Sequence, residues 1–328
     1  MKTFFIGIDI SKDSLDAALC KDPGQEIETT FRVENSIKGI SKLIRKSRKL
    51  KQELWFCFEH TGNYGLLLMC QLQAEGLNYS VVPALEIKQS QGMTRGKTDP
   101  IDAKRIARYA ATHSYKLKAF HLPGENLLKI KSMLAYRSQL VGMSRQLQNS
   151  YKSHQITHQA VDVSLILKDI QQNIDGLKEK IRKLEADIVE LIQQDPKISS
   201  NYIKASAVKG IGLIIAAYML VYTNNFTAFD NPRQFNCYAG LAPFEHTSGT
   251  SIVGKTKTSR LRNKTMKTLL FNGANIAANY DQQLKAYYNR KRQQGKPHNL
   301  IMNNIACKLV YRVFAMVNRD EPYVNFMN

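Results

Sequence analysis

Apolar runs alternate with turn residues along the first third of the chain. Runs over residues 4–11, 15–19 and 28–33 predict three strands of a meander, and a basic amphipathic helix is expected over 36–50. Further strands are expected over 54–59 and 79–83, with a helical run to Gly76 between them. A polar loop over 88–97 leads to a helix that starts near Pro100. This order of elements predicts an α/β domain with a mixed sheet.

The middle of the chain has helical periodicity. Residues 116–158 are basic and predict long helices. From Leu167 to Leu191, leucine and isoleucine then recur at alternating spacings of three and four, which is the a/d seam of a coiled coil that ends before Pro196. We expect the seam to mediate self-association into a dimer or tetramer. The alternative is a helical hairpin that packs within one chain.

The last third is predicted to be mainly α-helical. A Gly-x-Gly turn precedes an apolar helix over 213–221, a small-residue loop and a basic tract follow, and residues 265–328 suggest further helices. We therefore expect three segments. They are a sheet domain over 1–115, basic helices and a coiled-coil linker over 116–200, and a C-terminal domain over 201–328.

Composition places the chain among globular proteins. Its 328 residues are 43% hydrophobic, which is enough for two domains with a sizeable core. No uninterrupted apolar run has membrane-spanning length, and Asp9 follows the N-terminus too closely for a signal peptide, so we expect a cytoplasmic protein with no membrane association. The five cysteines are scattered and never form a Cys-x-x-Cys pair, which argues against a disulfide framework or a zinc site.

Positive charge is concentrated in two segments. The formal net charge is +20, of which residues 97–152 contribute +8 and residues 250–312 contribute +12, while the rest of the chain is balanced. Two basic surfaces of this size favour a nucleic-acid partner over ordinary solvated faces. The candidate contacts to a phosphate backbone are Lys129, Lys131, Arg137, Arg145, Lys209, Gly210, Gly212, Lys255, Lys257, Arg260, Arg262 and Lys264.

Four acids stand at the ends of predicted elements. Asp9 and Glu59 each end an apolar strand. Asp99 and Asp102 flank Pro100 at a helix start, where positions i and i+3 share one face. Together these carboxylates could hold Mg²⁺ or Mn²⁺ for phosphoryl transfer, because hard cations prefer oxygen ligands. The alternatives are a capping box, in which Asp99 caps the helix and Asp102 reaches back, and strand-end acids bonded to loops.

Two further patterns have a chemical and a purely structural interpretation. The Gly210-x-Gly212 turn could offer backbone N–H groups to a phosphate, or it could only permit a tight helix–helix turn. Ser248 lies in a small-residue loop before the basic tract and is a candidate nucleophile if a base or metal activates it, or else an ordinary loop serine. A serine-hydrolase triad has no support, because no Gly-x-Ser-x-Gly elbow is present.

Five short motifs together resemble a known family. They are 6–12 (IGIDISK), 59–64 (EHTGNY), 97–103 (KTDPIDA), 210–212 (GIG) and 239–243 (AGLAP) before Ser248-Gly249. In this order, along nearly the full length, they resemble the insertion sequence 110 family of transposases. Members are bridge-RNA-guided recombinases related to the pilin-gene inverting recombinase.

The resemblance implies a fold and a set of roles. The expected N-terminal domain is RuvC-like, with the RNase H fold and an Asp-Glu-Asp-Asp tetrad on Asp9, Glu59, Asp99 and Asp102. A coiled coil would join it to a C-terminal transposase domain whose nucleophile is Ser248. Family members are thought to act as tetramers, and a structured noncoding guide RNA pairs with double-stranded donor and target DNA. The implied reaction proceeds through a covalent phosphoserine assisted by Mg²⁺.

The residues alone are also compatible with three other functions. A RuvC-like junction nuclease would use metal-activated water and would leave Ser248 without a role. A site-specific DNA invertase would carry out the same chemistry outside a mobile element. A non-catalytic nucleic-acid scaffold would need only the basic segments.

Overall fold

The computed structural model describes residues 3–24, 27, 30–90, 98–248, 252–259 and 261–319. The chain divides into two compact units, Met1–Leu122 and Pro123–Asn328. The finer division predicted from the sequence, with boundaries at 115 and 200, stays a prediction. The elements of the first unit are β1 (Thr3–Ile10), β2 (Ser14–Cys20), β3 (Thr30–Glu34), α1 (Ile37–Arg48), β4 (Glu53–Glu59), η1 (Gly62–Gly65), α2 (Leu66–Ala74), β5 (Asn78–Val82), α3 (Ala84–Ser90), α4 (Asp99–Thr112) and η2 (Ser114–Lys116).

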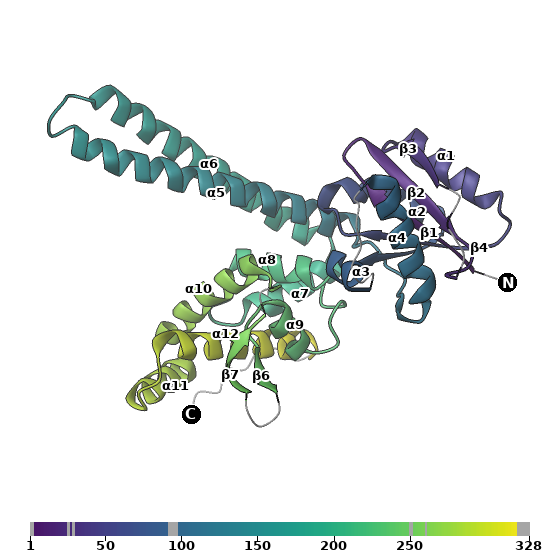
Figure 1. Cartoon of the computed structure of the whole chain (residues 1–328). Coiled ribbons are helices and arrows are strands. Elements are labelled where there is room, and N and C mark those ends of the chain that lie inside the picture. The colour runs from purple at the N-terminus through teal and green to yellow at the C-terminus, as the bar shows by residue number, and fades with distance from the viewer. Residues whose placement is uncertain are drawn as a thin grey trace. The chain divides into compact units, whose positions relative to one another are not determined.

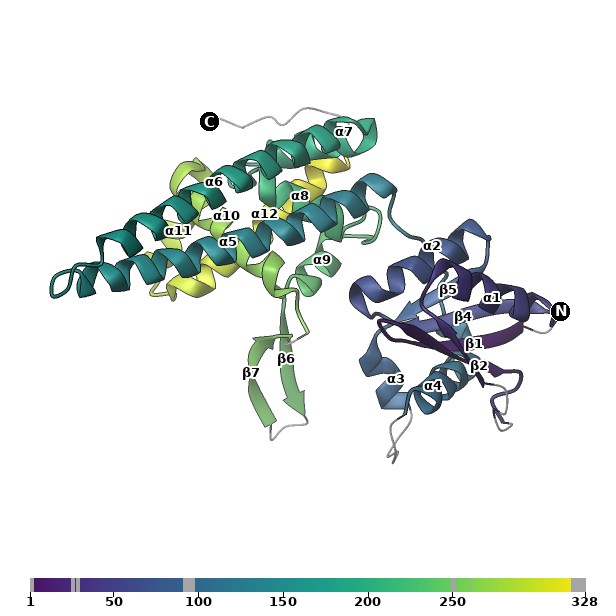
Figure 2. The ribbon, with the colours of Figure 1, turned by 90° about the horizontal axis from the view of Figure 1, so that it is seen from above.

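The first unit is built on a five-stranded mixed sheet with the order β3-β2-β1-β4-β5. The central strand β1 is antiparallel to β2 and parallel to β4, and β4 is parallel to β5. Figure 2 shows α1 and α2 on one face of this sheet and α4 on the other. The predicted mixed sheet is confirmed. A mixed sheet with helices agrees with the RNase H-like domain that the resemblance implies.

Residue alternation along β1 explains the two covered faces. Ile6, Ile8 and Ile10 are buried in one hydrophobic cluster with residues of α1 and α2. Gly7 points the other way, and a Cβ at this position would overlap the backbone of Ala103 and Ala107 in α4. Because glycine has no side chain, α4 lies directly on the central strand.

In the part of the second unit that the structure describes, helices and one β-hairpin are present, and the helices share a large hydrophobic core. Its core includes residues of the basic helices and of the last helices alike, from Leu127 to Met316. The elements are α5 (Glu125–Thr157), α6 (Ser164–Gln193), α7 (Pro196–Ser206), α8 (Leu213–Tyr222), α9 (Pro232–Tyr238), β6 (Pro243–Ser248), β7 (Ile252–Thr258), α10 (Lys264–Tyr280), α11 (Gln282–Gln293) and α12 (His298–Val317).

Helices α5 and α6 run side by side as a long hairpin (Figure 1). The predicted heptad seam lies on α6, where Ile170, Ile174 and Leu177 are buried. Arg137 of α5 also forms an ion pair with Glu185 of α6 at 2.6 Å. Within one chain, therefore, the seam packs α6 against α5, as in the helical hairpin that was the alternative from the sequence. Self-association through a coiled coil stays a prediction.

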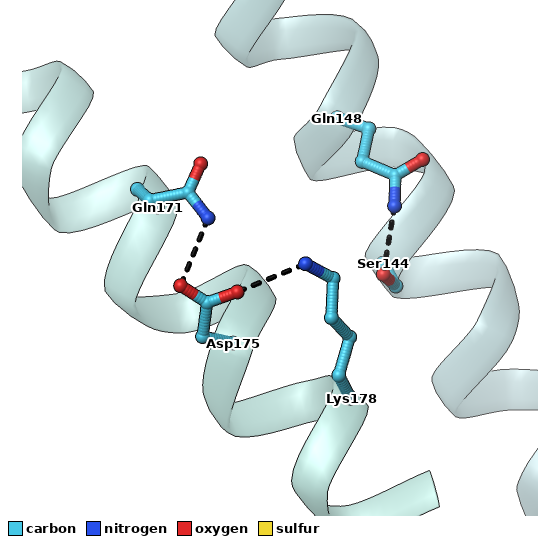
Figure 3. A network of polar contacts seen from close by, with 5 residues as sticks. All are labelled: Ser144, Gln148, Gln171, Asp175 and Lys178. Atoms are coloured by element: carbon cyan, nitrogen blue, oxygen red, sulfur yellow. Dashed lines mark hydrogen bonds and ion pairs between the residues drawn. The ribbon is translucent and has the colours of Figure 1, made fainter.

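Some polar contacts on the hairpin stay within single helices. Figure 3 shows Gln171 and Lys178 of α6 donating to the carboxylate of Asp175, while Gln148 of α5 donates to Ser144. The exposed contacts of Asp175 contribute little to stability. The cohesion of the hairpin therefore comes mainly from the apolar seam.

Three expectations about elements were wrong. The helix expected from residue 116 begins at Glu125, because Pro123 and the extended Gly124 interrupt the chain before it. Part of the polar loop over 88–97 is helical, since α3 runs to Ser90, and residues 91–97 lie outside the described residues. The tract after residue 243 forms β6 and β7, whose threonine, isoleucine and valine residues favour strands.

Helix α12 is long and apolar enough to cross a membrane by length and composition alone. Half of this apolar stretch is buried inside the unit. Ile305, Leu309 and Val313 are fully buried in the common core. With this packing, α12 is one of the core helices of the second unit.

Candidate active site

Three acids of the central sheet lie on the face that α4 covers. Asp9 of β1 is directly opposite Asp16 of β2, and cross-strand partners share a face. Glu59 ends the neighbouring parallel strand one position beyond the last register pair, Ile8 and Phe58. Because side chains alternate along a strand, all three acids lie on the same side as Gly7. The two parallel strands therefore bring Asp9 and Glu59 to the same edge of the sheet.

Helix α4 adds Asp99 and Asp102 to this edge. Thr98 is the N-cap residue, Asp99 is the first helical residue and Pro100 the second, so the expectation that Asp99 caps the helix was wrong. The capping box is not formed, because Thr98 makes no side-chain cap bond and the carboxylate of Asp102 pairs with Arg105 at 2.8 Å. The proline fixes the start of the helix, so both acids face the sheet edge from its first turn.

The charges of the neighbouring acids act on Asp9. Burial, together with the charges of Asp99, Asp102 and Glu59, raises the pKa of Asp9 to about 6. The structure thus brings together the four acids that the sequence singled out. Their mutual repulsion makes this edge a site that attracts cations.

Asp16 is a fifth acid, which the sequence analysis overlooked. It is only 4% exposed, and its Oδ2 accepts no hydrogen bond from any described residue. Burial raises the pKa of Asp16, while Arg32 at 3.7 Å lowers it. An acid inside an otherwise buried strand was the available signal, but the register that sets Asp16 opposite Asp9 cannot be read from the sequence.

The acids suit a divalent cation without forming a finished site for one. In the described part of the chain, no group of three or more His, Cys, Asp or Glu side chains is arranged to hold a metal ion. The donors at this edge are nevertheless all carboxylate oxygens, the ligands that Mg²⁺ and Mn²⁺ prefer. A cation here would also offset the repulsion that raises the pKa of Asp9. The donor set therefore fits such an ion.

Ser248 lies in the second unit, at the end of β6. It pairs with Ile252 of β7, and residues 249–251 between them lie outside the described residues. Gly240 lies shortly before β6, and its φ of +69° is one that favours glycine. The stem of Arg262 covers this glycine, and Lys267 Nζ donates to its carbonyl oxygen at 2.9 Å. Arg262 thus has a structural contact besides its predicted role toward nucleic acid.

The other predicted phosphate contacts of the second unit differ in their surroundings. Arg137 is committed to its ion pair with α6, and Lys129 pairs with Glu125 at 2.7 Å. The exposed predicted contacts with described surroundings are Lys131, Arg145, Lys209 and Lys264. The strand β7 carries Lys255 and Lys257, and Arg260 lies outside the described residues.

The glycine turn before α8 has a packing role. Gly210 has a φ of +96°, and a Cβ there would lie 2.5 Å from the carbonyl oxygen of Gly273 in α10. The backbone of the turn therefore packs against the backbone of α10, which agrees with the interpretation of Gly210-x-Gly212 as a tight helix–helix turn. Gly212 is the N-cap residue of α8 and has open space around it.

Comparison with protein families finds a matching family model in each unit. Residues 6–155 match a transposase model of the IS110 type, and residues 204–289 match the model of the transposase IS116/IS110/IS902 family. The two matches together span well over half of the chain. The chain belongs to the IS110 family of transposases. The first match contains the four clustered acids, and the second contains Ser248.

Relatives of this IS110 transposase include recombinases. The pilin gene-inverting protein of Moraxella bovis is 26% identical over 328 residues, which cover 98% of both chains. The insertion element IS110 43.6 kDa protein of Streptomyces coelicolor is 30% identical over 165 residues, covering 50% of this chain and 40% of that protein. The family and these relatives identify the chain as a DNA transposase or recombinase.

Solved structures of RuvC from Thermus thermophilus are similar to part of this IS110 transposase. One has 12% sequence identity and a TM-score of 0.28, with 36% of this chain and 99% of RuvC covered. A second, in complex with a Holliday junction substrate, has 11% identity and a TM-score of 0.29 with the same coverage.

Proposed function

We propose that this transposase cleaves and rejoins donor and target DNA through a covalent phosphoserine at Ser248, and that a structured noncoding guide RNA selects the DNA sites. The proposal is supported chiefly by the convergence of Asp9, Glu59, Asp99 and Asp102 at one edge of the sheet. A family match that contains these acids and a second that contains the serine add to it.

The four acids would hold Mg²⁺ or Mn²⁺, which when bound offsets the negative charge that develops on the reacting phosphate. The four carboxylates themselves contribute by staying ionised and oriented. Burial and the neighbouring carboxylates raise the pKa of Asp9 in the absence of a cation, so protons compete with the cation for this carboxylate. Activity should therefore fall in mild acid, and more of the cation should restore it.

Ser248 would act as the nucleophile. Its hydroxyl oxygen attacks the scissile phosphorus, the hydroxyl proton passes to a base, and the bond from phosphorus to one sugar oxygen breaks. The departing sugar oxygen takes up a proton and becomes a free hydroxyl. The seryl phosphodiester keeps the energy of the broken bond, so attack by a hydroxyl of another strand rejoins DNA without a nucleotide triphosphate.

Recognition would be shared between the protein and its guide. Exposed lysine and arginine residues bind phosphates and position double-stranded DNA and RNA without reading their sequence. Base pairing to the guide then supplies the specificity. We place the reaction at the nucleoid in a prokaryotic cytoplasm, with a dimer or tetramer as the working unit.

Recombination between two plasmids tests this proposal. One plasmid would carry the native flanking DNA of the gene, including its noncoding region, and the other a target site. We expect recombinants with the wild-type protein and none with Asp102→Asn or without the noncoding region. Recombination that continues without this region would refute guidance by RNA. Compensating changes in the guide and the target should restore a mismatched pair.

A junction nuclease is the second candidate, since the acid cluster alone would suffice for metal-dependent hydrolysis. Ser248→Ala separates the two functions. The nuclease predicts continued cleavage with free ends, whereas the proposed recombinase predicts that cleavage is lost.

A further inference from the structure

A cavity of about 580 Å³ opens between α11 and α12, in the second unit. This volume lies within the range of pockets that bind small molecules. Its lining residues are Gln283, Leu284, Tyr287, Arg290, Cys307, Lys308, Tyr311 and Arg312. The family match of the second unit ends at residue 289, so most of this lining lies beyond it.

The cavity is positively charged. Arg312 is neutralised by Asp281, a buried acid 2.7 Å away, and also donates to Gln283 at 2.8 Å. Arg290 and Lys308 have no ion-pair partner among the residues that the structure describes, and Asp281 is the only acid of the segment 250–312. Two positive charges therefore remain available for an anionic group.

Tyr287 holds these two cations in place. Lys308 Nζ lies 5.0 Å from the centre of its ring, and the guanidinium carbon of Arg290 lies 5.8 Å from it. Both distances are within the range of cation–π contacts. The hydroxyl of Tyr287 also accepts a hydrogen bond from Asn304 at 3.3 Å, which helps to fix the ring.

Tyr311 provides an open aromatic surface in the same cavity. Its side chain is 49% exposed. The floor beside it is uncharged, because Leu284 is buried and burial raises the pKa of the Cys307 thiol to about 11, which keeps that thiol protonated. An apolar floor and a free ring suit a flat, weakly polar group such as a nucleobase.

We propose that this cavity binds one unstacked nucleotide of a single-stranded nucleic acid, with the base on Tyr311 and the phosphate on Arg290 and Lys308. Aromatic rings next to cations are the common means of binding single strands, because each base has a face to stack and each nucleotide has a phosphate. The inference rests on the proposed function for the presence of single strands, which are supplied either by a loop of the guide RNA or by opened DNA.

Binding of short single-stranded oligonucleotides to the full-length protein tests this site. Fluorescence anisotropy would compare labelled oligouridylate and oligothymidylate of about 12 nucleotides with a duplex of equal length, a probe length chosen on the scale of one single-strand site. Tyr311→Leu should weaken single-strand binding about tenfold and leave duplex binding unchanged. Arg290→Gln with Lys308→Gln should make the salt dependence shallower, by about 0.7 in the logarithmic slope for each phosphate that is no longer neutralised.

Matched variants outside the cavity control for general effects. Tyr136 on α5 has nearly the same exposure as Tyr311, at 51%, and Tyr136→Leu should bind single strands like the wild type. Lys180→Gln on α6 serves the same purpose for the loss of positive charge. Since Tyr311 is half exposed, its replacement should leave the melting temperature unchanged, which verifies folding.

The outcomes separate the possible sources of the nucleotide. If the wild type binds oligouridylate more tightly than oligothymidylate and Tyr311→Leu removes this difference, the site belongs to RNA. If oligothymidylate binds equally well or more tightly, the site belongs to opened DNA. Single-strand binding by Tyr311→Leu at the wild-type level, or an equal loss in the Tyr136→Leu control, would overturn the inference. Neither result depends on Ser248, so failure here leaves the proposed recombination chemistry to be decided by its own tests.

Discussion

At the scale of single residues, the acid cluster makes the free protein less stable. Asp9 has a pKa of about 6 in the folded chain against an ordinary value of 3.8, so the folded state holds its proton more tightly than the unfolded state does. Stability from this group is therefore greatest below about pH 4 and is lost as the pH rises through about 6. A cation bound at neutral pH would restore it.

Because the raised pKa of Asp9 costs stability at neutral pH, removing its charge should stabilise the free protein. In the presence of a chelator, Asp9→Asn should raise the melting temperature at pH 7.5 by a few degrees relative to the wild type, because an amide carries no charge to repel its neighbours. At pH 4 the difference should disappear. The measurement is thermal unfolding of the full-length protein followed by circular dichroism.

Asp13→Asn is the matched control, since Asp13 is an exposed acid of the same unit. It should leave the melting temperature unchanged at both values of pH. If Asp9→Asn lowered the melting temperature at pH 7.5, the acids around Asp9 would not repel one another as described.

The position of α4 also depends on a single residue. Gly7→Ala should destabilise the first unit by about 1–3 kcal/mol, because the added Cβ overlaps the backbone of α4 at Ala103 and Ala107. The helix would have to move, and with it Asp99 and Asp102, so we expect loss of recombination even at temperatures where the variant is folded. Urea denaturation and the plasmid assay measure the two effects.

Gly142→Ala provides the comparison, because that position lies inside α5 with nothing within 4 Å of an added Cβ. Alanine there should stabilise the helix by about 1 kcal/mol. Full recombination activity of Gly7→Ala would contradict the close packing of α4 on the central strand.

At the scale of elements, the periodic patterns predicted most helices and strands, and irregular sequences did not. The strands β1, β2 and β4 and the helix α6 follow from their apolar periods, because packing and pattern agree there. The β6–β7 hairpin was not predicted, since its alternation of lysine and threonine indicates a basic tract as readily as a strand. The start of α5 was set by Pro123 and Gly124, which outweighed the helical composition of residues 116–122.

The hairpin of α5 and α6 gives a prediction at this scale. Ile174→Ala should reduce the free energy of unfolding by about 2–4 kcal/mol, because it opens a cavity in the buried seam. Its neighbour Asp175 makes only the exposed contacts of Figure 3, and Asp175→Ala should leave the unfolding curve unchanged. Both are measured by urea denaturation. A similar effect of the two variants would contradict the seam as the source of cohesion.

At the scale of the whole molecule, the sequence predicted the acids of the site better than their arrangement. Strand ends and a proline-marked helix start indicated Asp9, Glu59, Asp99 and Asp102, and the resemblance to a family joined them into one tetrad. Asp16 could not be found in this way, because only the pairing of β1 with β2 sets it beside Asp9. Register depends on tertiary packing rather than on local pattern, so a fifth acid was visible only in the folded chain.

We propose that the IS110 transposase joins itself to DNA through Ser248. The most direct measurement is to express the protein with its native flanking DNA and a target plasmid, denature the mixture, and identify any peptide that is covalently linked to DNA. We expect an adduct on the peptide containing Ser248 in the wild type and in Ser251→Ala, and none in Ser248→Ala or Asp102→Ala. Cleavage that persists in Ser248→Ala without an adduct would contradict the serine mechanism and leave a metal-dependent nuclease.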